Sequence, residues 1–102
     1  MPEYLFDTTA PSAPTSLNLI FNKPTTTSWA SSSLSWNKST DDVVVAGYNV
    51  YRNGKRIGAS ISNNYKDSFP TAGTGTLYSY TVKAFDAAGN LSASSNEVLT
   101  VY

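Results

Sequence analysis

The sequence of 102 residues contains no cysteine and no histidine. The chain therefore cannot form a disulfide, a zinc site of the usual Cys/His kind, or a nucleophile that relies on a histidine base. Its stability does not depend on redox state, and the lack of cysteine leaves the cellular compartment undecided. The chain also lacks a run of about 18 apolar residues, so we expect no membrane-spanning segment.

Charge is scarce and balanced, with seven basic and seven acidic residues. Nucleic-acid-binding proteins need a basic surface against the phosphates, so we expect no nucleic-acid partner. The first six residues, MPEYLF, have neither the basic start nor the apolar core of a signal peptide. If the protein is exported, we expect its signal to lie outside this chain.

Apolar residues make up 40% of the chain and aromatic residues 13%, which indicates a globular protein. A chain of this length is expected to form one domain, with a core large enough to fold without a metal or a disulfide. The segment DTTAPSAPT (7–15) contains Pro11 and Pro14, which favour an extended linker. We therefore expect residues 1–14 to be an N-terminal extension and linker, and residues 15–102 to be the folded domain.

Apolar and polar residues alternate from residue 16 onward, with turn residues at short intervals. This period of two predicts strands, whereas helices are disfavoured by the abundance of Ser and Thr and by the lack of a three-four repeat. The chain is thus predicted to be all-β, an immunoglobulin-like sandwich of two sheets with about seven antiparallel strands. The clearest predicted strands are 16–21, 32–37, 47–52, 78–84 and 96–102. The side chains predicted to face the core are Leu34, Trp36, Tyr48, Val50, Tyr78, Tyr80 and Val82.

Two stretches, SSSLSWNKSTDDVVVAGYNVYRNGKRIG and LYSYTVKAFDAAGNLSASSN, resemble a fibronectin type III domain. They are most similar to the bacterial subtype that is attached to extracellular polysaccharide-degrading enzymes such as chitinases and cellulases. The resemblance covers residues 7–102 and implies that Trp36 is the buried tryptophan of the second strand. It also implies that Tyr78, at the start of the sixth strand, bonds the preceding loop through its hydroxyl.

The chain departs from this family at two places. The segment PTAGTGTL (70–77) is about two residues longer than the usual spacing before the tyrosine of the sixth strand. The opening MPEYLF matches nothing in the family and resembles a remnant of a preceding module.

The acidic residues offer no pair for catalysis. Asp41 and Asp42 are adjacent and would point to opposite faces of a strand, while Asp67 and Asp86 are expected in turns, bonded to local backbone. No strand-turn-helix elbow frames a serine. We therefore predict no catalytic residue, no cofactor and no metal, because a single carboxylate at Asp86 falls far short of a calcium site. The 86–90 loop also lacks the Arg-Gly-Asp tripeptide that integrins recognise in some animal relatives.

A few surface side chains are candidates for contact with a partner. Trp29 and Tyr51 are predicted to lie outside opposite sheets, so they cannot form one sugar-stacking platform. Asn53-Gly54 is the pair that a type I′ turn requires, and the charges around it are expected to keep an edge strand soluble. The candidate contact residues are Tyr51, Arg52, Lys55, Arg56 and Trp29.

The resemblance implies a non-catalytic spacer module of a secreted or cell-surface bacterial protein, with a polysaccharide-degrading glycoside hydrolase as the expected parent. Its expected partners are the neighbouring domains of the same chain, and we expect a monomer. Two alternatives remain open at this stage. One is a weak carbohydrate-binding module that contacts polysaccharide, and the other is a cell-surface interaction or adhesion module.

Overall fold

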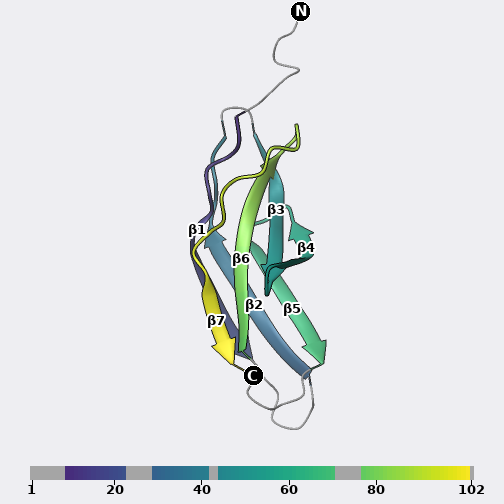
Figure 1. Ribbon diagram of the computed structural model, residues 1–102. Coiled ribbons are helices and arrows are strands. Elements are labelled where there is room, and N and C mark those ends of the chain that lie inside the picture. Colours follow the sequence, from purple (N-terminus) through teal and green to yellow (C-terminus); the bar gives the residue numbers. More distant parts are fainter. Residues whose placement is uncertain (1–8, 23–28, 42–43, 71–76, 102) are drawn as a thin grey trace, which may run out of the picture.

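The computed structural model describes residues 9–22, 29–41, 44–70 and 77–101 (Figure 1). Within these ranges the chain forms seven strands and no helix, so the described part has no helix that could cross a membrane. The strands are β1 (Thr15–Asn22), β2 (Trp29–Asn37), β3 (Val45–Arg52), β4 (Lys55–Ser60), β5 (Asn64–Pro70), β6 (Leu77–Asp86) and β7 (Val98–Val101).

The strands form two antiparallel sheets that pack face to face. One sheet has the order β1-β2-β5 and the other has the order β4-β3-β6-β7. Figure 1 shows the two layers, with β7 at one edge and β4 at the other edge of the four-stranded sheet. The predicted all-β, two-sheet sandwich with seven strands is confirmed.

Alternation along each strand decides which side chains enter the space between the sheets. In β6, Tyr80, Val82 and Ala84 are fully buried, while Thr81 and Lys83 between them are half-buried on the outer face. Tyr78 is partly buried and packs against this core. The buried apolar cluster consists of Leu17, Leu34, Trp36, Tyr48, Val50, Tyr80, Val82 and Ala84.

The turn between β3 and β4 has the backbone that its sequence predicts. Asn53 and Gly54 have φ values of 55° and 80°, which confirms the two positive φ angles of a type I′ turn. The Asn53 amide donates to the Ser79 carbonyl at 2.8 Å, and the Asn53 side chain accepts from the Ser79 amide at 2.9 Å. These two bonds join the turn to β6.

The segment before β7 covers the edge of β6 without being a strand. The amides of Val82 and Ala84 donate to the hydroxyls of Ser95 and Ser92, at 3.0 Å and 2.8 Å. Serine side chains thus satisfy amides that a regular neighbouring strand would otherwise bond. β7 begins at Val98, later than the predicted residue 96, and the Asn96 side chain instead bonds the amide and carbonyl of Leu17 in β1.

The described part of the expected linker packs on the sandwich. Pro11 and Pro14 are buried, and the Ser12 amide donates to the Thr40 carbonyl at 2.8 Å. The Thr40 amide in turn donates to the Ser12 hydroxyl at 2.9 Å. These contacts attach residues 11–14 to the loop that follows β2.

Gly58 of β4 allows the aromatic ring of Tyr65 on β5 to approach the β4 backbone closely. A methyl group at position 58 would lie 2.9 Å from Tyr65 Cζ and 3.0 Å from Cε1, closer than carbon atoms pack. We expect Gly58→Ala to lower the free energy of unfolding by about 1–3 kcal/mol, because the ring must move out of its site. Urea denaturation would measure the loss.

The neighbouring exposed residue Ala59 provides the control, because Ala59→Ser should change stability by no more than about 0.5 kcal/mol. In a Tyr65→Ala background the cost of Gly58→Ala should largely disappear, since the two positions are in contact. An equal cost in both backgrounds would contradict the steric explanation.

Candidate functional site

A buried polar network joins the two sheets. Arg52 Nη1 of β3 donates to Asp67 Oδ2 of β5 at 2.6 Å, forming an ion pair. The Tyr80 hydroxyl of β6 donates to the same carboxylate oxygen at 2.7 Å. Asp67 therefore receives donors from two strands of the opposite sheet, within the space that otherwise holds apolar side chains.

The prediction that Asp67 lies in a turn and the prediction that Arg52 is a surface charge were both wrong. Asp67 is 7% exposed and lies inside β5, not in a turn, so its carboxylate does not bond local backbone there. The Arg52 side chain is 25% exposed and points inward, so it is not a free surface charge beside the turn. The reason is strand parity: position 52 continues the inward set that includes Tyr48 and Val50.

The network keeps the Arg52 guanidinium charged. Burial by itself lowers the pKa of Arg52, but the hydrogen bond and the negative charge of Asp67 outweigh it, so this pKa is raised above its ordinary value. An arginine also offers several donors in a planar fork that suits a carboxylate. The arrangement thus links the two sheets through a charged arginine and its carboxylate partner.

Asp86 behaves as its turn position predicts. Its carboxylate accepts the Ala88 amide at 3.0 Å, the Asn90 amide at 2.9 Å and the Asn90 side-chain nitrogen at 2.9 Å. Gly89 has a φ of 92°, the left-handed conformation that this loop requires. Among the described residues no three or more His, Cys, Asp or Glu side chains gather into a possible metal site.

A groove of about 580 Å³ lies at the end of the sandwich where β2 and β4 finish. Its polar wall comes from Ser39, Asp41 and Asn63, and its apolar wall includes the exposed Ile61. Asn63 is occupied in the fold, because its side-chain nitrogen donates to the Trp36 carbonyl at 2.8 Å.

The structure brings Tyr51 and Arg56 opposite each other on one sheet and separates Arg52 and Trp29 from them. Tyr51 is half-buried on the outer face of the four-stranded sheet, and Lys55 and Arg56 are exposed on its edge strand β4. Arg52 belongs to the inner network. Trp29 begins β2 in the other sheet, and its side chain lies outside the described residues.

Residues that the sequence reasoning missed lie beside Tyr51. Lys83 of β6 holds its Nζ 5.6 Å from the centre of the Tyr51 ring, and Arg56 Nε donates to Asn49 Oδ1 at 3.1 Å. Outward parity on β3 and β6 was the available signal for Asn49 and Lys83. It could not show which residues of the two strands are opposite each other.

Two sequence expectations about the loop before β6 remain untested. The bond of the Tyr78 hydroxyl to that loop, and the effect of the two extra residues, both involve positions 71–76. These positions lie outside the described residues.

Segments similar to this chain occur within larger enzymes. No protein-family model matches the chain. The chain is 48% identical over 92 residues to chitinase A1 of Niallia circulans, a match that covers 90% of this chain and 12% of that protein. It is 42% identical over 89 residues to a poly(3-hydroxybutyrate) depolymerase of Ralstonia pickettii, covering 87% of this chain and 16% of the relative.

A solved structure, that of a Fn3-like protein from Clostridium thermocellum, has the same architecture. Its TM-score is 0.66 at 28% sequence identity, and the match covers 87% of this chain and 90% of that chain. The chain therefore corresponds to nearly all of this Fn3-like protein but to less than a fifth of either enzyme.

Proposed function

Because the chain belongs to the fibronectin type III family, we propose that it is a non-catalytic accessory module that spaces the other domains of a multidomain bacterial protein. We further propose that the parent is secreted or displayed at the cell surface, and is a polysaccharide-degrading glycoside hydrolase in which this module acts as a monomer. The observation that carries the proposal is the small share of each related enzyme that the chain matches.

The names of the relatives favour a spacing role over recognition of one ligand. A chitinase and a poly(3-hydroxybutyrate) depolymerase, named for chemically different polymers, share this segment at 48% and 42% identity. Binding of one polymer cannot be the role that the segment has in both relatives. A module that sets a distance between domains would serve both.

The geometry suits such a role. Ser12 is bonded to the loop after β2 at one end, whereas Val101 pairs with Leu77 near the β3–β4 turn at the other. Figure 1 shows these two described ends at opposite poles of the sandwich. A strand of ten residues such as β6 spans roughly 33 Å, so the module would separate its neighbours by about that length.

Within this proposal, residues 11–14 of the expected 1–14 linker belong to the module. Residues 11–14 are attached to the sandwich through buried prolines and the Ser12–Thr40 bonds, so they would move with it.

The test is made on the full-length parent enzyme. Replacing the module with a flexible Gly/Ser linker should lower activity on insoluble polymer several-fold, because the catalytic domain loses its fixed distance from the surface. Activity on a small soluble substrate should stay within about twofold, since that reaction needs no positioning. Equal losses on both substrates would refute the spacing role.

A further inference from the structure

The outer face of the four-stranded sheet carries two cations on either side of an aromatic ring. Tyr51 of β3 pairs with Arg56 on β4, and Asn49 of the same strand pairs with Lys83 on β6. Paired side chains project from the same side of a sheet, so all four share the outer face. We refer to Asn49, Tyr51, Arg56 and Lys83 as the cationic face.

Contacts within the cationic face hold both cations in place. Asn49 Oδ1 accepts the hydrogen bond from Arg56 Nε, which leaves the outer end of the guanidinium to face solvent. The Lys83 ammonium lies over the Tyr51 ring at 5.6 Å, within the range of a cation–π interaction. Because these side chains are already ordered, a ligand would pay less entropy to bind them.

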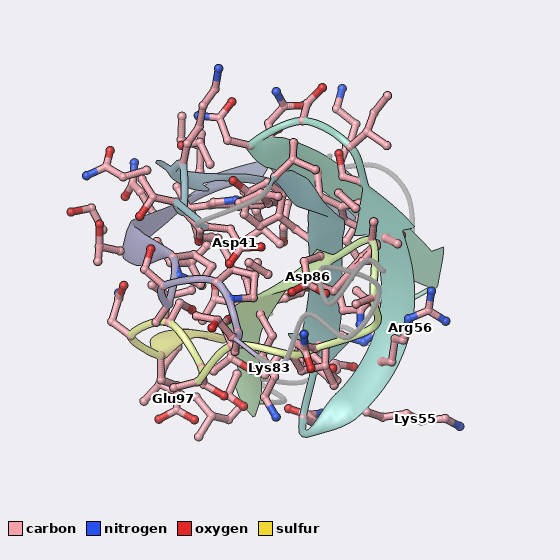
Figure 2. All side chains as sticks on the ribbon, turned by 90° about the horizontal axis from the view of Figure 1, so that it is seen from above. Asp41, Lys55, Arg56, Lys83, Asp86 and Glu97 are labelled. Atoms are coloured by element: carbon pink, nitrogen blue, oxygen red, sulfur yellow. The ribbon has the colours of Figure 1, made fainter. Side chains whose placement is uncertain are left out.

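The two cations have no carboxylate partner among the described residues. The ion pair of Arg52 and Asp67 lies on the inner side of the sheets, and Asp86 is turned into its own loop. Figure 2 shows Lys55 and Arg56 together at one side of the molecule, Glu97 at the other side, and Lys83 between them. Arg56 and Lys83 therefore carry two positive charges on this face that no described carboxylate pairs with.

We propose that the cationic face binds a polysaccharide that carries carboxylate groups. Arg56 and Lys83 lie on strands two interstrand spacings apart, about 10 Å, so they can pair with separate carboxylates along an extended chain. The side-chain amide of Asn49 and the hydroxyl of Thr81 lie beside these cations and could form hydrogen bonds with the sugar hydroxyls. This inference rests on the proposed function, because it takes the parent to act on polysaccharide.

A protein partner fits this face less well. Protein interfaces are centred on desolvated apolar or aromatic anchors, whereas the only aromatic ring of the cationic face is half-buried and covered by Lys83. The exposed Leu77 and Leu99 are on the same side of the sheet but lie towards its other end, at and beyond the level of the β3–β4 turn. Charge and hydroxyl recognition therefore dominate at the cationic face.

The test uses this chain with three soluble probes, followed by amide chemical shifts in NMR. The probes are an oligogalacturonate, a neutral cello-oligosaccharide and an oligoglutamate peptide of similar length. We expect the oligogalacturonate to shift the amides of Asn49, Tyr51, Arg56 and Lys83. Affinity should fall roughly tenfold between about 20 mM and about 200 mM salt, because exposed charges are screened.

The double variant R56S/K83S should weaken binding of the oligogalacturonate at least about tenfold relative to K38S/K66S. Lys38 and Lys66 are exposed and lie off the cationic face, so the control pair makes the same change in net charge. Equal weakening by both pairs, no shifts at low salt, or equally tight binding of the neutral sugar would overturn the inference. Tighter binding of oligoglutamate would also overturn it and would indicate an acidic protein partner. None of these variants changes the length of the module, so failure here is distinct from failure of the spacing role.

Discussion

Asp67→Ala is expected to lower the free energy of unfolding by about 3 kcal/mol, because it leaves the Arg52 guanidinium without its counter-charge between the sheets. This expected loss is at the low end of the range for breaking a buried ion pair, because a quarter of the Arg52 side chain is still exposed to solvent. The substitution also removes the acceptor of the buried Tyr80 hydroxyl, which donates to Asp67 at 2.7 Å. Urea or thermal denaturation of the isolated chain would measure the loss.

The control for this prediction separates the charge from the space that it occupies. The double variant Arg52→Met/Asp67→Leu removes both charges, and we expect it to recover at least about half of the loss. Arg56→Ala, which removes an exposed arginine of the other face, should change stability by no more than about 0.5 kcal/mol. If the double variant were less stable than Asp67→Ala alone, an unpaired charge would not be the cause.

Trp36→Ala is expected to cost about 3–5 kcal/mol, the range for truncating a large buried ring. Trp36 is 3% exposed, and its ring meets that of Tyr48 edge to face, with the centroids 5.3 Å apart. The two rings come from opposite sheets, so the truncation would open a cavity between the layers. We expect cooperative unfolding at a clearly lower denaturant concentration.

Trp36→Phe tests the chemical part of this prediction. The indole Nε1 is buried and has no acceptor among the described residues, so Trp36→Phe breaks no hydrogen bond to them. Phenylalanine keeps most of the ring contact and removes that donor, and it should therefore cost no more than about 2 kcal/mol. Similar losses for Trp36→Phe and Trp36→Ala would mean that ring packing with Tyr48 is not what matters.

The residues of these two predictions would also keep the length of the module fixed. The Arg52–Asp67–Tyr80 network and the Trp36–Tyr48 pair both connect one sheet to the other. A spacer keeps a fixed length only if its sheets do not slide, and both the directional hydrogen bonds and the close-packed rings oppose sliding. Variants that break the network should therefore weaken the spacing role in the parent enzyme as well.

Local features of the chain were readable from the sequence. The period of two decides which residues of β6 face inward, and the Asn53-Gly54 pair decides the turn, because each property depends only on neighbouring backbone. Asp86 was readable for the same reason, since its partners lie within four residues. These properties were sufficient for the fold class and for the resemblance to the family.

Only the tertiary structure determined which residues of different strands contact each other. Parity could have placed Arg52 and Asp67 on the inner faces, but it could not pair them, because they belong to different sheets. The cationic face depends in the same way on strand register, which shifts between Val50 and Tyr51 and so brings Arg56 opposite Tyr51. Along a strand the sequence determines the side on which each residue lies. Only the packing of the two sheets and the register of their strands decides which charge it meets there.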